Sequence, residues 1–370
     1  MTTDNLFSGV YTGRRVLVTG HTGFKGAWLT RWLMSLGARV GGYALPPPTN
    51  PSLFAALDWS GLDHCIGDVR DAAALAARVE GFQPEVIFHL AAQPLVRRSY
   101  AEPVETFATN VLGTVHLLEA VRRARRPCAV VVVTSDKCYQ ESDDRRPRTE
   151  TDPLGGRDPY SASKACAEMV AAAYARAFCG PDGRLALATA RAGNVIGGGD
   201  WAEDRIVPDC IRALQAGRPI PVRRPDATRP WQHVLEPLSG YLWLGARLWL
   251  SASQGQAGLT GAFNFGPEPD GHQKVRVLVE AVLWHWPGRW ETAATADDPH
   301  ENECLQLSID RAAHELGWRP VWDFSTAVER TVRWYRKVAN EGSSRATELT
   351  DADLAAYGQT ALKLGQPWAR

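Results

Sequence analysis

The sequence predicts an α/β protein with a Rossmann-type doubly wound parallel sheet and a smaller C-terminal substrate-binding lobe. Three observations indicate this fold. Short apolar strands alternate with helix-length segments through the first half, a glycine-rich turn follows the first strand, and the alternation loosens after about residue 194. Strands separated by helices are typical of a parallel sheet that is covered on both faces. With 370 residues, the chain is long enough for two lobes.

The elements are predicted from apolar runs and from helical periodicity. "RVLVTG" and "AVVVVTS" are rich in β-branched residues, which favours buried strands. The expected order is strand 15–20, helix 24–35, strand 38–45, strand 85–92, helix 104–125, strand 129–135 and strand 184–197.

Three parts of the chain are expected. Residues 1–193 form the dinucleotide-binding domain, residues 194–340 the lobe that binds the substrate, and residues 341–370 a C-terminal tail. The segment 227–255 contains the strongly helical "VLEPLSGYLWLGARLWL", and we expect it to return to the first domain.

Composition narrows the class of protein. Lys plus Arg and Asp plus Glu both total 41, which gives no reason to expect nucleic-acid or membrane partners. The first residues lack the apolar core of a signal peptide, and no apolar run is long enough to span a bilayer. The seven cysteines contain no C-x-x-C pair, so we expect reduced thiols, a cytoplasmic protein and no metal site.

The turn "TGHTGFKG" predicts a dinucleotide site. Gly20, Gly23 and Gly26 follow the first strand and open a helix, so backbone N–H groups can approach a pyrophosphate. A plain structural turn is the alternative. No Asp or Glu lies between Gly26 and Asp58 to hold the ribose hydroxyls, and no Arg or Lys directly follows the second strand, so NAD is favoured over NADP only modestly.

"DPYSASKACAE" places Tyr160 and Lys164 on one face of a helix. A nearby ammonium is expected to lower the pKa of the phenol from its usual value of about 10, which suits a base that removes a hydroxyl proton during hydride transfer. The same spacing also occurs by chance on solvated helix faces. The glycine turn and the polar strand end "TSDK" favour the catalytic interpretation.

Four longer strings carry a family resemblance: "TSDKCYQ", "DPLGGRDPYSASKACAE", "GNVIGGGDWAEDRIVPD" and "RPWQHVLEPLSGYL". Over about residues 15–335 the chain resembles extended short-chain dehydrogenase/reductases of the nucleotide-sugar branch, and more narrowly the CDP-glucose 4,6-dehydratases. The resemblance implies a hydro-lyase that uses NAD to convert CDP-glucose to CDP-4-dehydro-6-deoxyglucose. It also implies a homodimer through paired helices, with 104–125 and 160–178 as candidates.

The resemblance also implies roles for individual residues. Thr134 would hydrogen-bond the sugar 4-hydroxyl beside the base Tyr160, and Asp136 would protonate the leaving 6-hydroxyl. Lys137 stands where related dehydratases have a glutamate, so two roles stay open: a neutral amine that takes the C5 proton, or a cation that stabilises an enolate. The cofactor would contact Gly20, Thr22, Gly23, Phe24, Gly26, Asp68, Val69, Leu90, Ala91, Ala92, Tyr160 and Lys164.

Arg229 matches a phosphate-binding arginine of the family, and Asn194 matches an asparagine near the substrate diphosphate. Arg205 and Gln93 are further candidates for substrate contact, whereas His89 is expected to be structural. Two rival functions remain. One is another nucleotide-sugar enzyme, such as a 4-epimerase, a decarboxylase or a different dehydratase, and the other is a non-catalytic dinucleotide sensor.

Overall fold

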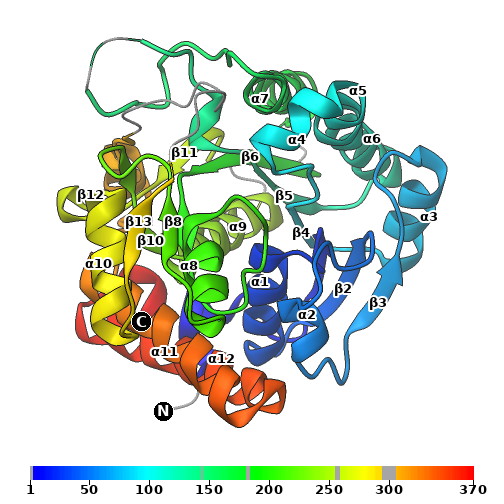
Figure 1. Ribbon diagram of the computed structural model, residues 1–370. Coiled ribbons are helices and arrows are strands. Elements are labelled where there is room, and N and C mark those ends of the chain that lie inside the picture. Colours follow the sequence, from blue (N-terminus) through cyan, green and yellow to red (C-terminus); the bar gives the residue numbers. More distant parts are fainter. Residues whose placement is uncertain (1–2, 143, 145, 181–183, 255–258, 294–305) are drawn as a thin grey trace.

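The computed structural model describes residues 3–370, apart from residues 143, 145, 181–183, 255–258 and 294–305 (Figure 1). Its strands are β1 Arg15–Thr19, β2 Arg39–Ala44, β3 Asp63–Ile66, β4 Val86–His89, β5 Cys128–Val133, β6 Leu185–Ala192, β7 Val195–Ile196, β8 Ile220–Val222, β9 Thr228–Pro230, β10 Gln232–His233, β11 Gly261–Phe265, β12 His272–Lys274 and β13 Trp290–Thr292. Its α-helices are α1 Phe24–Ser35, α2 Leu53–Ala56, α3 Ala72–Phe82, α4 Val96–Ala101, α5 Pro103–Phe107, α6 Gly113–Ala124, α7 Pro159–Phe178, α8 Ile206–Gln215, α9 Leu235–Ser253, α10 Val275–His285, α11 Phe324–Glu341 and α12 Ala346–Lys363.

The central sheet has seven strands in the order β11-β6-β5-β4-β1-β2-β3. All of its pairings are parallel. This is the 3-2-1-4-5-6 order of a dinucleotide-binding fold with β11 added at one edge. The predicted fold class is therefore confirmed.

Alternating side chains divide the core into two apolar layers. Val16 and Val18 of β1 pack into a cluster with α1, α9 and α12 on one face of the sheet. Leu17 points to the other face, where α3, α6 and α7 lie. The four valines 130–133 of β5 are divided between the two clusters in the same way. Both faces are thus covered, which explains why these strands read as continuous apolar runs.

The segment expected to form a helix over 104–125 is α5 followed by α6, joined by a π-helical turn over Ala108–Leu112. Side chains of α9 pack in the same apolar layer as those of β4, β5 and β6, in line with the expected return of 227–255. The proposed domain boundaries themselves stay predictions. The C-terminal tail docks through α12 and through Trp368, which is fully buried and stacks on Phe7.

Within the described residues, none of the helices combines the length and apolar character needed to cross a membrane. The described part of the chain also holds no group of three or more His, Cys, Asp or Glu side chains arranged to bind a metal ion.

Candidate active site

The glycine turn after β1 lies against the loop that follows β4. Gly20 has φ +76°, and a Cβ on it would lie 2.7 Å from the Ala91 backbone nitrogen. A Cβ on Gly26 would lie 2.1 Å from the Gly20 carbonyl oxygen, so the turn and the start of α1 can approach only as glycines. The space beside Gly23, the N-cap of α1, is nearly open, since a Cβ there meets only the Gly20 carbonyl oxygen at 3.4 Å. This open helix start fits a dinucleotide pyrophosphate.

The other residues predicted to contact the cofactor already make contacts within the protein. The hydroxyl of Thr22 donates to the Leu45 carbonyl at 2.8 Å, which ties the turn to the end of β2. The Asp68 carboxylate is half-exposed and already accepts from Arg70 at 2.6 Å, which lowers its pKa. Val69 is buried against Gly113. Contact of Asp68 with an adenine therefore stays a prediction, and it would compete with Arg70.

Two consecutive hydroxyls follow β5, and they point in opposite directions. Thr134 donates to the carboxylate of Glu168 on α7, while the next residue, Ser135, donates to Asp136 Oδ1 at 3.0 Å. Ser135 is also close enough to the phenol of Tyr160 for its hydroxyl to lower the pKa of that phenol. The sequence analysis placed Thr134 beside Tyr160, and the structure corrects this to Ser135, because side chains of an extended chain alternate in direction.

Tyr160 and Lys164 lie in the first turns of α7, which starts with Asp158 as N-cap and Pro159 at the first helical position. Lys164 Nζ donates to the Val133 carbonyl at 3.3 Å, so α7 and the end of β5 are joined at the site. Burial raises the pKa of Tyr160 to about 12 despite the opposing effect of the Ser135 hydroxyl. Burial also lowers the pKa of Lys164 to about 8. The pKa of Tyr160 is therefore raised in the protein alone, where burial has the largest effect, and not lowered as the sequence predicted.

Asp136 lies near Tyr160, and its charge acts to raise the pKa of that phenol. Only 4% of Asp136 is exposed, and burial raises its pKa, against the opposing charge of Lys137 and the hydrogen bond from Ser135. Its Oδ2 lies against Gly193, where a Cβ would approach to 2.8 Å. A buried carboxyl group with a raised pKa is suited to donate a proton.

Two site residues were missed by the sequence analysis. Lys25, at the start of α1, is half-buried near Asp136 and Lys164, and its partial removal from solvent lowers its pKa to about 7. Its Nζ lies 5.9 Å from the ring centre of Tyr241 on α9. The Tyr241 hydroxyl is buried without a hydrogen-bond partner among the described residues, and the charges of Asp136 and Tyr160 act on it.

Among the predicted substrate residues, Arg229 is close enough to lower the pKa of Asp136 by its charge. Arg205 pairs with Asp200 at 3.0 Å, and its charge acts on Tyr160. Asn194 is half-buried in the loop between β6 and β7.

Gln93 is different, because it is buried and its side-chain nitrogen donates to the Leu95 carbonyl and to Thr106. Both amide hydrogens are thus already used within the protein, so the substrate contact of Gln93 stays a prediction and would compete with these bonds. His89 is also buried, between the hydroxyls of Thr19 and Thr114, and is structural as expected.

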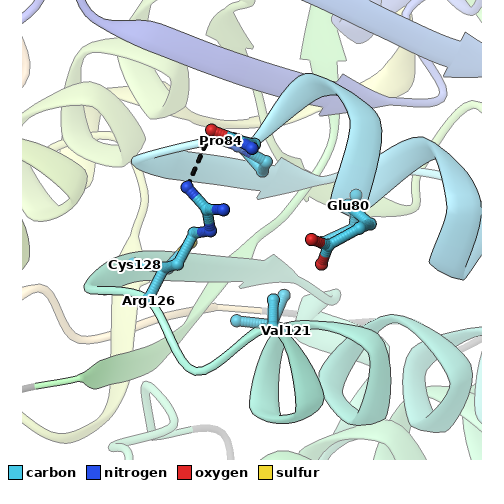
Figure 2. Close-up of a pocket in the computed structure, with 8 residues that line it drawn as sticks. Glu80, Pro84, Val121, Arg126 and Cys128 are labelled. Carbon is cyan, nitrogen blue, oxygen red and sulfur yellow. Dashed lines mark hydrogen bonds between the residues drawn. The ribbon is translucent and has the colours of Figure 1, made fainter.

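A surface pocket lies far from these residues, between α3 and α6 at the amino ends of β4 and β5 (Figure 2). Its lining includes Glu80, Val121 and Cys128, and Arg126 closes one side by donating to Gln83 at 2.7 Å. Parallel sheets of this kind bind ligands at the carboxyl ends of their strands. The pocket is therefore separate from the candidate active site.

Comparisons with known proteins agree with this arrangement. Residues 16–248 match the model of the NAD dependent epimerase/dehydratase family. The chain is 45% identical over 333 residues to CDP-glucose 4,6-dehydratase of Salmonella typhimurium, covering 88% of this chain and 91% of that protein. It is 28% identical to dTDP-glucose 4,6-dehydratase of Xanthomonas campestris, covering 86% and 92%.

Among solved structures, dTDP-glucose 4,6-dehydratase from Streptomyces venezuelae with NAD and TYD bound is similar, with a TM-score of 0.74 and 29% identity. The match covers 89% of this chain and 98% of that one. An epimerase from Methanothermobacter thermautotrophicus shares the fold at a TM-score of 0.76 and 23% identity. Because the family model covers more than half of the residues, the chain belongs to the NAD dependent epimerase/dehydratase family.

Proposed function

We propose that this protein is an NAD-dependent hydro-lyase that converts CDP-glucose to CDP-4-dehydro-6-deoxyglucose. The observation that carries the proposal is the buried carboxyl group of Asp136, with its raised pKa, beside Ser135 and Tyr160. An epimerase eliminates no water and has no need of such an acid. The 45% identity to a CDP-glucose 4,6-dehydratase supports the choice of nucleotide.

The cofactor would lie along the glycine turn and the Leu90–Ala92 loop, and it would reach Tyr160 and Lys164 at the catalytic end. When bound, NAD supplies a temporary acceptor for the C4 hydride, which is returned to C6 in the same turnover. The chain supplies the proton chemistry. Tyr160 accepts the proton of the sugar 4-hydroxyl, and Lys164, which is hydrogen-bonded to the end of β5, holds its positive charge next to that position.

Oxidation at C4 acidifies the C5 proton, and elimination then needs both an acid and a base. Asp136 donates a proton to the leaving 6-hydroxyl, so that water departs. Lys137 is partly buried beside Asp136 and is the candidate for the C5 side, either as a base or as a cation that stabilises the enolate. Arg229, Asn194 and Arg205 would bind the diphosphate.

The test is a panel of CDP-, UDP-, GDP- and deoxythymidine-diphospho-glucose, with the product identified by mass and NMR. We expect a 6-deoxy-4-ketone from CDP-glucose. A product that retains its 6-hydroxyl would instead indicate an epimerase. Tyr160→Phe should lower the rate by about 10²–10⁴-fold while leaving NAD binding in place. Tyr174→Phe, a half-buried tyrosine on the same helix, is the matched control.

We further propose a homodimer. Exposed apolar side chains on α4, α5, the π-helical turn and α7 form a face that suits a second copy of this chain: Tyr100, Val104, Phe107, Leu112 and Met169. Light scattering should give twice the monomer mass, and Val104→Asp should shift it toward the monomer. A cytoplasmic location is proposed as well, in line with the free state of the described cysteines.

A further inference from the structure

The proposed reaction leaves Tyr160 and Asp136 in protonation states that must be reset before the next turnover. In the proposed dehydration, Tyr160 gains the proton of the 4-hydroxyl, while Asp136 gives a proton to the 6-hydroxyl that leaves as water. The C5 proton is removed and replaced, so it cancels. After each turnover Tyr160 therefore holds one proton too many and Asp136 one too few. The next turnover requires a proton to pass from the phenol to the carboxylate.

Solvent has poor access to both groups. Tyr160 is 8% exposed and Asp136 is 4% exposed. Ser135, itself 6% exposed, interacts with both: its hydroxyl donates to Asp136 Oδ1 at 3.0 Å, and it is close enough to the phenol of Tyr160 to lower the pKa of that group. Its orientation is held by the Lys137 backbone N–H, which donates to Ser135 Oγ at 3.2 Å. One hydroxyl thus connects the group that must lose a proton to the group that must gain it.

The neighbouring hydroxyl does not offer a second route. Thr134 donates to Glu168, and that carboxylate also accepts from Thr189 and Arg191 at 2.7 and 2.8 Å. The Thr134 proton is therefore committed to a buried structural network. Ser135 alone of this pair faces both reacting side chains.

The two carboxyl oxygens of Asp136 have different neighbours, which suits a group that receives and delivers protons. Oδ1 is bound by Ser135, whereas Oδ2 lies against Gly193, next to Asn194. A carboxyl group can accept a proton on one oxygen and donate from the other. The charge of Arg205 also lowers the pKa of Tyr160, so it stabilises the phenolate that the transfer leaves behind.

We propose that Ser135 relays a proton from Tyr160 to Asp136 between turnovers. The Tyr160 O–H bond breaks as a new O–H bond forms at Ser135 Oγ, and the original Ser135 proton moves to Asp136 Oδ1. No electrons are exchanged with another group, and the result is a phenolate ready to accept the next 4-hydroxyl proton and a neutral acid ready for the next elimination. The inference rests on the proposed dehydration, and it assigns Ser135 a step that follows the chemistry on the sugar.

The test compares Ser135→Ala, which lacks the hydroxyl, with Ser135→Thr, which keeps it. Rapid-quench measurements with CDP-glucose separate the first turnover from the steady state. For Ser135→Ala we expect a burst of one product per site, followed by a steady-state rate about 100-fold below the burst rate, in the range of lost acid–base catalysis. Added imidazole at constant pH should raise this slow rate and leave the burst unchanged. Ser135→Thr should show neither the burst nor the dependence on imidazole.

The relay would be overturned if Ser135→Ala lowered the burst rate and the steady-state rate equally and imidazole restored neither. Ser135 would then be a positioning residue for the 4-hydroxyl. Absence of any dehydrated product from the wild type and Ser135→Thr alike would instead refute the proposed reaction. If Ser135→Ala does not fold by circular dichroism, the wild type provides the test in D₂O. A relay with two moving protons predicts a larger solvent isotope effect on the steady state than on the first turnover, and equal effects would contradict it.

Discussion

Gly193→Ala should separate the two halves of the proposed reaction, because Gly193 forms the surface on which Asp136 rests. A Cβ at this position would lie 2.8 Å from Asp136 Oδ2 and 2.8 Å from Pro230 Cγ. Gly193 does not have a positive φ, so alanine is compatible with the backbone and acts through its side chain alone. The new methyl group therefore displaces the carboxyl group that is expected to protonate the 6-hydroxyl.

The size of the effect follows from these contacts. Ordinary carbon contacts begin near 3.4 Å, so the carboxyl group or Pro230 must give way by about 0.6 Å. A misplacement approaching 1 Å costs a catalytic group about 10²-fold, so we expect dehydration to fall by about 10- to 100-fold. The three atoms nearest to the new methyl group belong to Asp136 and Pro230 and not to the glycine turn or Tyr160, so C4 oxidation should persist and reduced cofactor should accumulate.

Stopped-flow absorbance of the reduced cofactor, with product measured by NMR, distinguishes the two steps. Gly81→Ala is the matched control, since Gly81 lies in α3 and a Cβ there meets nothing within 4 Å. That variant should keep its activity and gain some stability, because alanine favours a helix. Wild-type dehydration by Gly193→Ala would refute the placement of Asp136 as the acid.

Three further predictions follow from the same contacts. Asp136→Asn cannot donate a proton, so dehydration should fall by at least about 10²-fold while reduced cofactor accumulates, and an unchanged product yield would exclude Asp136 as the acid. Asp136 can donate a proton to the leaving hydroxyl only in its protonated form, and burial raises the pKa of this carboxyl group. The dehydration rate of the wild type should therefore fall as the pH rises through that raised pKa, which a pH profile of kcat would check. Glu168→Gln breaks an ion pair with Arg191 in which both side chains are 3% exposed, so the free energy of unfolding measured with urea should fall by about 3–5 kcal/mol. The control Glu119→Gln breaks a more exposed ion pair, with Arg122, and should lower that free energy by at most about 1 kcal/mol.

The fold was predictable because most strands of the central sheet are recognisable as apolar runs in the sequence. Strands that are buried on both faces are apolar throughout, and the glycine turn fixes where β1 meets α1. The sequence analysis missed β3 and β11. Three of the four residues of β3 are exposed, so the strand lacks an apolar pattern, and β11 joins the edge of the sheet from a segment where helices and loops dominate.

The site was predictable to the extent that its residues lie in local motifs. Tyr160, Lys164 and Asp136 were identified from their spacing and from the strand end, and the structure brings Tyr160 and Lys164 of α7 next to the polar end of β5. The choice between Thr134 and Ser135 depends on which face each presents, and strand alternation through β5 is the signal that could have decided it. Lys25 on α1 and Tyr241 on α9 lie close together only because these two helices pack against each other. A local sequence pattern cannot predict such a contact.

Several cations surround Asp136, although its proposed function requires a protonated carboxyl group. Lys25, Lys137 and Arg229 all favour the ionised form of Asp136, and burial opposes them. A nucleotide sugar brings a diphosphate, whose negative charges compensate these cations and act directly against a second anion nearby. We therefore expect the diphosphate of the proposed substrate, when bound beside these cations, to favour the protonated form of Asp136 and the charged form of Lys25, whose pKa is about 7.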